Sequence, residues 1–498
     1  MAKPAVLITV FAFSWGSLAI YAVLLARRPL DLLCIFYVAA CLLSLASAIA
    51  IPQPNLSKSV AFFILFWLLF VFIQTSLSLR NPAAFDFYRI EPSSLDVVYI
   101  GNSHVDGVDS GIIDNILGIN SYALAYQGID MGGVFYAVSQ ALQNQHPNII
   151  VVEAYPLRKN SVQGNDYNYA LGSHYALRGI PFFESIPDLF PQALYLDALF
   201  PLLYYHSRWT LVDNSSFFNE IAKNFVYAAF DTFPSNIQRA FISQRQILPN
   251  TIIDYQLITS ADQERYPLGS DSTDPVLDSN AGFLERLQDL CDKNNIRLIL
   301  VDIPTLLVAL QETPANTSTS QVAAENNIPY FNYNNIYEED YSRVHFWDFG
   351  HLNNLGSAVI SLHVAELLSE QLEIPINEEV MQQYQNILVK NLQVDGQGNQ
   401  ITYTLNLVEG ALSNAEFIWH VVDQNGNVFA DIPYSNQNYV TFTLPVIGPY
   451  TITMGVRNQI HPELHFEVTL TERYNPEIDL QLQMNTATQQ IIKFVVDS

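Results

Sequence analysis

The stretch Val97-Val-Tyr-Ile-Gly-Asn-Ser-His-Val-Asp106 joins a short apolar run to a small polar turn. Residues 95–100 carry the β-branched and aromatic side chains of a buried strand, and an apolar 3.6-residue period after Ser110 predicts a helix. A strand that leads through a turn into a helix is the repeating unit of a parallel α/β sheet. Ser103 is therefore expected at the carboxyl edge of the sheet, where such folds place ligands.

Further apolar runs and helical periods alternate along the same part of the chain. We expect four more strands, at residues 121–125, 149–153, 297–301 and 328–332, and helices at residues 110–117, 132–143, 281–293 and 355–372. This alternation predicts an α/β domain over residues 90–375, with a doubly wound parallel sheet. A long insertion at residues 160–280, rich in Tyr, Phe and Pro, is expected to cap the carboxyl edge of that sheet.

The pattern changes to strict alternation of apolar and polar residues near the C-terminus. The alternation is clearest at residues 401–407, 417–422 and 439–444, and turn signals such as Gly448-Pro449 separate the runs. Strands at this spacing predict an Ig-like β-sandwich over residues 390–498. Such a domain binds, spaces or braces, and its sequence suggests no chemistry of its own.

Three apolar runs with almost no charge occupy the N-terminus, at residues 5–26, 32–51 and 60–79. Each is about 20 residues long, which is enough to cross a hydrocarbon core of roughly 30 Å. The first run is too long for the apolar region of a cleaved signal peptide. The sequence therefore predicts a three-helix membrane anchor over residues 1–79, ahead of the α/β domain and the sandwich.

The charge of the chain limits its partners. There are 22 Lys and Arg against 48 Asp and Glu, a formal net charge of -26, so the chain repels the phosphate backbone and a nucleic-acid partner is not expected. Three cysteines do not form a disulfide framework. Positive charges near the spans lean weakly toward a cytoplasmic soluble region, but long domains translocate largely regardless of charge. We expect a multi-pass protein of the cell membrane whose soluble region lies outside the cytoplasm.

A second informative segment is His345-Phe-Trp-Asp348-Phe-Gly-His351-Leu-Asn-Asn-Leu-Gly356, just before the last predicted helix of the α/β domain. An Asp three residues before a His can hold the imidazole N–H and stabilise the imidazolium that forms when the ring accepts a proton. Taken alone, the segment could equally be an ordinary surface Asx turn, and Ser103 alone could be a helix cap. A metal site is disfavoured because neither a His-x-x-x-His pair nor a cysteine cluster accompanies the two histidines.

Together the two segments resemble the SGNH (GDSL-like) hydrolase superfamily, and look most like its membrane-anchored branch, which includes the teichoic-acid D-alanylation protein and alginate O-acetyltransferases. The resemblance implies a flavodoxin-like three-layer domain, with Ser103 as nucleophile, His351 as general base and acid, and Asp348 as the group that orients His351. The backbone N–H groups of Ser103 and Gly128 would bind the oxyanion. The chain departs from the family's third motif, since Val152-Glu-Ala-Tyr-Pro156 has no asparagine where the family supplies a third donor.

Four more residues are weaker candidates for contact with substrate. His104 follows the expected nucleophile directly, and a structural hydrogen bond to the turn is its alternative role. His206, Arg208 and Trp209 combine a hydrogen-bonding group, a cation and an aromatic plane, which suit a sugar or a phosphate. A buried brace within the insertion is an equally good reading of these three.

The sequence thus predicts a membrane-anchored serine esterase or O-acyltransferase that acts on an acylated cell-envelope glycan or polymer through an acyl-enzyme. Its expected partners are that glycan, membrane lipid and, from the resemblance, a separate membrane acyltransferase that delivers the acyl group. No cofactor and no metal is expected. The alternative is a noncatalytic envelope protein that binds or assembles polysaccharide and retains a vestigial triad.

Overall fold

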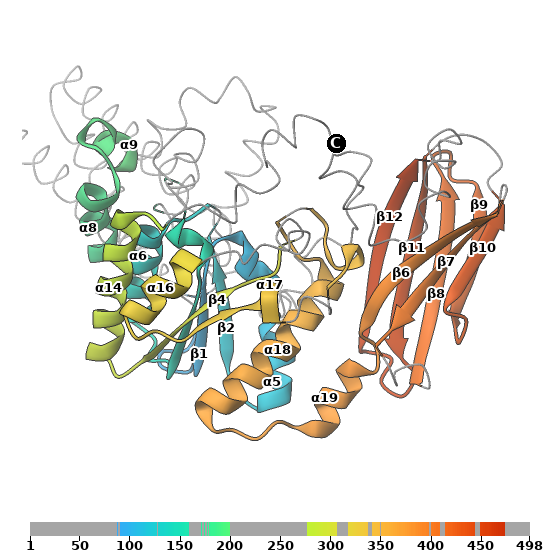
Figure 1. The fold of residues 1–498 in the computed structure, drawn as a ribbon, viewed down its shortest axis with the longest axis horizontal. Coiled ribbons are helices and arrows are strands. Elements are labelled where there is room, and N and C mark those ends of the chain that lie inside the picture. The colour runs from blue at the N-terminus through green and yellow to red at the C-terminus, as the bar shows by residue number, and fades with distance from the viewer. Residues whose placement is uncertain are drawn as a thin grey trace, which may run out of the picture.

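The computed structural model of the 498-residue chain describes residue 87 and residues 90–126, 128–158, 171, 174, 177, 179–199, 276–305, 317–336, 341–348, 350–397, 400–408, 414–443 and 449–473. Within these ranges lie an α/β domain and two antiparallel sheets, which Figure 1 shows side by side.

A five-stranded parallel sheet forms the centre of the α/β domain, in the order β2-β1-β3-β4-β5. The order reverses at β1, which pairs with β2 on one side and β3 on the other. The space beyond the carboxyl ends of β1 and β3 is therefore the switch point at which doubly wound sheets bind ligands. All five expected strands are confirmed: β1 (Val97–Gly101), β2 (Ser121–Ala125), β3 (Ile149–Glu153), β4 (Arg297–Asp302) and β5 (Tyr330–Asn332).

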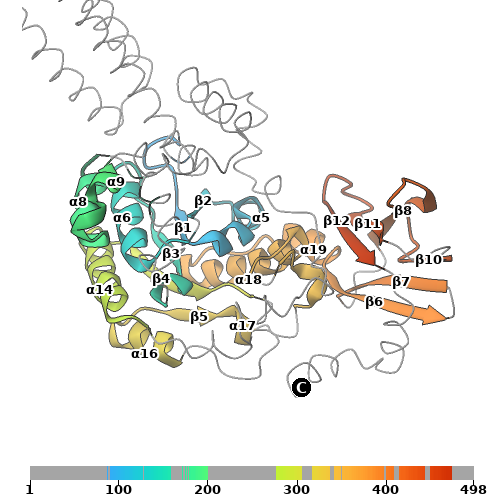
Figure 2. The ribbon, with the colours of Figure 1, turned by 90° about the horizontal axis from the view of Figure 1, so that it is seen from above.

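Helices cover both faces of the sheet, because the side chains of each buried strand alternate between two apolar cores. Val97 and Tyr99 point into the core shared with α5 and α18, whereas Val98 and Ile100 point into the core shared with α6 and α14. Figure 2 shows the two helical layers on opposite sides of the strands. The four expected helices are confirmed within a few residues: α5 (Ser110–Leu117), α6 (Met131–Ala141), α14 (Asp278–Lys293) and α18 (Asn354–Leu372).

Side-chain caps explain where the helices beside the switch point begin. The Asp109 carboxylate accepts the N–H of Gly111 at 2.9 Å, and Asn353 caps α18 in the same way. Helix α5 ends where Gly118 adopts a left-handed conformation with φ of 67°. The shorter elements of this domain are η1 (Ser103–Gly107), η2 (Tyr155–Leu157), α8 (Gly179–Leu189), η4 (Gln192–Leu194), α9 (Tyr195–Leu199), α16 (Thr317–Glu325), α17 (Tyr333–Ile336), η9 (Arg343–His345) and α19 (Glu378–Gln385).

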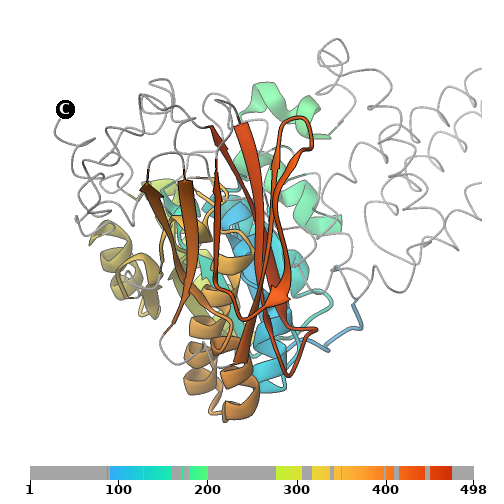
Figure 3. The ribbon, with the colours of Figure 1, turned by 90° about the vertical axis from the view of Figure 1, so that its right-hand side faces the viewer.

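Two antiparallel sheets follow, in the orders β10-β7-β6 and β12-β11-β8-β9. Their facing side chains share one core that includes the fully buried Trp419, and the hydroxyls of Tyr403 and Tyr450 join the two sheets at 2.7 Å. Figure 3 shows the two sheets packed face to face, as expected for a sandwich. The strands are β6 (Val389–Gln397), β7 (Gln400–Leu407), β8 (Ala415–Asp423), β9 (Val428–Ser435), β10 (Tyr439–Thr443), β11 (Pro449–Asn458) and β12 (His465–Arg473).

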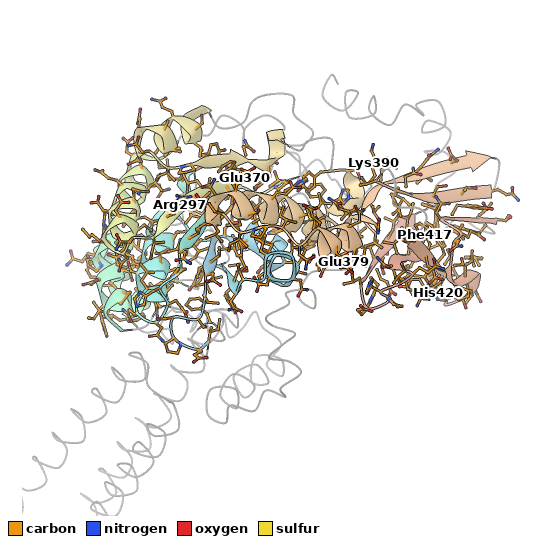
Figure 4. The ribbon with its side chains drawn as sticks, turned by 90° about the horizontal axis from the view of Figure 1, so that it is seen from below. Arg297, Glu370, Glu379, Lys390, Phe417 and His420 are labelled. Atoms are coloured by element: carbon orange, nitrogen blue, oxygen red, sulfur yellow. The ribbon has the colours of Figure 1, made fainter. Side chains whose placement is uncertain are left out.

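The sandwich is fixed to the α/β domain through the side that carries α18 and α19. The apolar core of α5 and α18 continues into the sandwich, and Nδ2 of Asn354 donates to the carbonyl of Glu467 at 3.0 Å. Figure 4 shows the junction, with Glu379 on α19 and Lys390 on β6 at its two sides. The sandwich therefore packs against the helix that follows the Asp-x-x-His segment.

The expectation of a three-helix membrane anchor requires correction. In the ranges that the structure describes, each helix is too short or too polar to cross a bilayer. The longest of these helices, α18, uses its apolar side chains in the core between the sheet and the sandwich. The runs at residues 5–26, 32–51 and 60–79 lie outside the described residues. The fold class is therefore revised to a parallel α/β domain followed by two antiparallel sheets.

The described part of the insertion packs against one helical layer of the α/β domain. Helix α8 packs beside α6, where the hydroxyl of Tyr136 donates to Asp188 at 2.5 Å and Arg286 pairs with the same carboxylate at 3.0 Å. Apolar side chains of α8, among them Phe182 and Ile186, extend the core of α6 and α14. This part of the insertion therefore widens one helical layer. Most of residues 160–280 lies outside the described residues, so the cap over the carboxyl edge stays a prediction.

Candidate active site

Ser103 begins a short 3-10 helix, η1, directly beyond β1. The Asn102 side chain caps this helix by accepting the N–H of His104 at 2.8 Å. Gly101 allows the turn to pass close to β3, since a Cβ at this position would lie 2.6 Å from Cβ of Glu153 and 2.8 Å from Cγ2 of Val105. The sequence Gly-Asn-Ser-His thus sets the serine at the switch point of the sheet.

Asp348 and His351 lie in a tight turn between η9 and α18. Oδ1 of Asp348 accepts the backbone N–H groups of Gly350 and His351, both at 2.8 Å, so the carboxylate closes the turn. The same carboxylate lies 2.8 Å from Nδ1 of His351 through both of its oxygens. The Trp347 ring stacks on the imidazole, with centroids 5.3 Å apart. The ring of His351 is therefore held from its Nδ1 edge and from one face.

Nε2 of His351 lies 2.7 Å from Oγ of Ser103, so the structure brings the three side chains together as expected from the sequence. Because the Asp348 carboxylate accepts a hydrogen bond from the N–H at Nδ1, Nε2 is the unprotonated nitrogen and accepts a hydrogen bond from the serine hydroxyl. Asp348 and His351 are about one-third exposed, which leaves the group open to a substrate. An Asp-His-Ser chain in this order can generate a serine nucleophile.

The loop after β2 approaches the same turn. The N–H of Tyr126 donates to the carbonyl of Gly101 at 2.9 Å, so this loop starts beside the end of β1. Gly128 follows with φ of 63°, a left-handed conformation that favours glycine. Ser103 is the first residue of η1, and the first N–H groups of a helix have no acceptor within the helix. These positions are compatible with the expected roles of both backbone N–H groups.

Glu153 occupies the end of β3, near the place where the resembling family has an asparagine, and its side chain is 1% exposed. One carboxylate oxygen lies 3.0 Å from Nδ1 of His104, and the other accepts the N–H of Asn102 at 3.4 Å. The His104 ring also contacts the His351 ring edge-to-face, with centroids 5.2 Å apart. Glu153 was not among the residues predicted from the sequence, although a carboxylate that ends a buried apolar strand was the available signal.

Two further polar features lie at this edge of the sheet. Asp106 is three residues after Ser103 on η1, and burial raises the pKa of its carboxyl to about 6, opposed by the nearby His351. Arg158 forms a buried ion pair with Asp302, at 2.7 Å, and the hydroxyl of Tyr330 bonds the same carboxylate. The pair links the C-cap of η2 to the last residue of β4, and Tyr330 is the first residue of β5. These three residues are far apart in the sequence, so the sequence did not predict the contact.

The three candidate residues of the insertion and the comparisons with known proteins add no further residue to this site. His206, Arg208 and Trp209 lie outside the described residues, so their expected roles stay predictions. Among the described residues, no group of three or more His, Cys, Asp or Glu side chains could hold a metal ion. Neither a family model nor a curated protein matches the chain.

Proposed function

We propose that the chain is a serine esterase or O-acyltransferase that acts on an acylated cell-envelope glycan or polymer. The observation that carries this proposal is the hydrogen-bonded series Asp348-His351-Ser103, with contacts of 2.8 and 2.7 Å, at the switch point of a parallel sheet. A serine that only braces the fold or caps a helix does not need a histidine and a carboxylate aligned behind it. Activation of a serine as a nucleophile requires both.

The proposed reaction proceeds through an acyl-enzyme. Oγ of Ser103 attacks the acyl carbon of the substrate while its proton moves to Nε2 of His351, and Asp348 stabilises the imidazolium. The tetrahedral intermediate then expels the alkoxide, which takes the proton from His351 and leaves as an alcohol. The backbone N–H groups of Ser103 and Gly128 would stabilise the negative oxygen in between.

The second half of the reaction releases the acyl group. His351 takes a proton from water in an esterase, or from a glycan hydroxyl in a transferase, and the incoming oxygen displaces Ser103 from the acyl carbon. Ser103 regains its proton from His351. The resemblance to envelope O-acyltransferases supports the glycan as acceptor and a membrane acyltransferase as donor partner. This chemistry depends on the described site and requires no membrane-spanning helix.

Labelling with a fluorophosphonate tests the proposal on the full chain, together with hydrolysis of 4-nitrophenyl acetate. Wild type should label, and Ser103→Ala should neither label nor hydrolyse the ester. Ser139→Ala is the matched control, because the Ser139 hydroxyl bonds a carbonyl of its own helix at 2.9 Å. Labelling of Ser103→Ala, or an unlabelled wild type, would refute the assignment.

The noncatalytic alternative has one observation in its favour, which is the presence of Glu153 instead of an asparagine at the end of β3. In that case the chain would bind an envelope polysaccharide without turning it over. An unlabelled wild type that retains affinity for acylated glycans would favour this alternative.

A further inference from the structure

Two turns meet at the proposed triad, and more than the contact between Ser103 and His351 joins them. The first is η1, which begins with Ser103. The second is the turn that carries Asp348 and His351, which we call the base turn. The base turn is closed by an antiparallel bridge between Phe346 and Leu352. Because its two ends are joined, a contact at one of its residues positions the turn as a unit relative to η1.

His104 supplies one contact between the two turns. Its ring meets the ring of His351 edge-to-face, with centroids 5.2 Å apart and an interplanar angle of 70°. Nε2 of His104 lies 3.4 Å from the place that a Cβ on Gly350 would take. The ring therefore lies against the base turn at the proposed base and at the residue before it, and any larger residue at position 350 would crowd the ring.

A second contact lies at the other end of η1. Gly107 faces Leu352, whose Cδ1 lies 3.3 Å from the place that a Cβ on Gly107 would take. Leu352 is buried, so this end of the contact is closely packed. On the base turn, His351 lies between the two residues that make these contacts. Its distance of 2.7 Å to Ser103 is thus set where the two turns pack on both sides of it.

The ring of His104 is held in place from the sheet. Nδ1 lies 3.0 Å from Oε1 of Glu153, and both side chains are buried. The other carboxylate oxygen of Glu153 accepts the N–H of Asn102 at 3.4 Å, so this side chain holds the residues before and after Ser103. The Tyr155 ring also contacts the imidazole, with centroids 5.1 Å apart. Movement of the imidazole away from the base turn would break a buried hydrogen bond, which is costly.

We infer that His104 is a positioning residue: its ring, held by the sheet, spaces the base turn from η1 and so sets the distance between His351 and Ser103. The inference rests on the proposed function. It depends on the size and place of the ring, and it is the same for a neutral and for a charged imidazole. A base takes a proton only at hydrogen-bond distance, and a misplacement of about 1 Å can lower a rate about 100-fold. A spacer between the two turns therefore controls the rate without contacting the substrate.

Complementary substitutions on the two turns test this spacing. Gly350→Ala adds a Cβ that presses on Nε2 of His104 and pushes the base turn away from η1. His104→Asn keeps an amide donor for Glu153 but removes the ring atoms that meet Gly350, which leaves a gap. The double variant places the new Cβ in that gap and restores the contact. Gly282→Ala is the matched control, because a Cβ at this position of α14 meets nothing within 4 Å.

Each full-length variant would be assayed for kcat and KM with 4-nitrophenyl acetate, alongside its thermal midpoint. Gly350→Ala should lower kcat by about 3- to 10-fold and His104→Asn by about 10-fold. KM should stay within about twofold of wild type in both, because neither residue contacts the substrate. The double variant should return to within about threefold of wild type, whereas independent losses would multiply to about 30- to 100-fold. Gly282→Ala should match wild type.

Crystal structures of the same variants provide a readout that needs no substrate. The distance between Oγ of Ser103 and Nε2 of His351 should change in each single variant and return to 2.7 Å in the double variant. An unchanged distance in both single variants would show that the ring of His104 does not space the two turns. Should one single variant fail to fold, the other still carries its expected kcat, KM and distance.

The results distinguish this inference from the proposed function. If wild type is inactive toward both the ester and a fluorophosphonate, the proposed function is wrong, and the crystal distances still decide whether His104 spaces the turns. If wild type is active and depends on Ser103, three outcomes would refute the inference alone. The single losses multiply in the double variant, both single variants stay within twofold of wild type, or KM rises while kcat is unchanged.

Discussion

Oγ of Ser103 lies 2.7 Å from Nε2 of His351 across 248 residues of sequence. Neither residue is placed by its own neighbours alone. Strand β1 carries Ser103 to the carboxyl edge of the sheet, and the core between the sheet and α18 brings the turn of His351 to the same edge. The contact therefore depends on the packing of the whole α/β domain. Because it joins two identified atoms, we can predict which substitutions around it should break it.

Asp348→Asn should lower kcat for ester hydrolysis by about 10³- to 10⁴-fold with little change in the thermal midpoint. The asparagine oxygen can still accept the N–H groups of Gly350 and His351, so the turn is kept. Its amide would then face Nδ1 of His351, which moves the ring proton to Nε2 and removes the acceptor for the Ser103 hydroxyl. Steady-state kinetics at pH 8 measure this loss, and a variant with more than a tenth of wild-type kcat would contradict the tautomer argument.

Gly101→Ala should destabilise the fold by about 1–3 kcal/mol, because the new Cβ meets Cβ of Glu153 at 2.6 Å and the neighbouring backbone has to move. Denaturant unfolding measures the change. Gly282→Ala is the matched control in α14, where a Cβ meets nothing within 4 Å, and it should stabilise the helix by about 0.5–1 kcal/mol. Equal stability of the two variants would mean that β1 and β3 do not approach as described.

Stability should also depend on pH through Asp114, which accepts the backbone N–H and the hydroxyl of Ser121 at 3.1 and 2.6 Å. Burial raises the pKa of this carboxyl to about 7, and the charges of Asp109 and Asp96 add to the effect. The native state therefore holds a proton that the unfolded state has already released, so stability falls as the pH rises from about 4 to 7.

Asp114→Asn cannot ionise and should escape this loss. The thermal midpoint of the variant, relative to wild type, should be higher at pH 8 than at pH 4. Asp395→Asn provides the control, since Asp395 is an exposed residue of the sandwich whose carboxylate accepts a hydrogen bond from the side-chain amide of Gln393. An Asp114→Asn curve parallel to that of wild type across this range would show that Asp114 titrates normally.

Local sequence signals predicted much of the α/β domain, but they did not predict which side chains on neighbouring strands contact one another. Helix α5 was predicted from its apolar 3.6-residue period, and its ends are set by the local caps Asp109 and Gly118. Asp348 and His351 were predicted because their interaction lies within one turn. The pair of His104 and Glu153 depends on β1 lying beside β3, which is a tertiary fact. The membrane anchor was predicted from apolar run length alone, a signal that carries no information on tertiary structure.

The last prediction concerns His345, which connects the base turn to the sandwich. Its side chain is fully buried; Nδ1 accepts the N–H of Ser342 at 2.9 Å, and Nε2 therefore carries the proton that it donates to the carbonyl of Val389 at 2.7 Å. His345→Phe keeps the ring but leaves an N–H and a carbonyl unpaired, at about 1–3 kcal/mol each. Denaturant unfolding should show this loss, and kcat should fall because Asp348 lies three residues further along. His420→Phe, which breaks an exposed pair on the sandwich, should cost about 0–1 kcal/mol and leave kcat unchanged. If His345→Phe behaves like that control, the sandwich does not support the base turn, and the contact between η9 and β6 has no part in positioning His351.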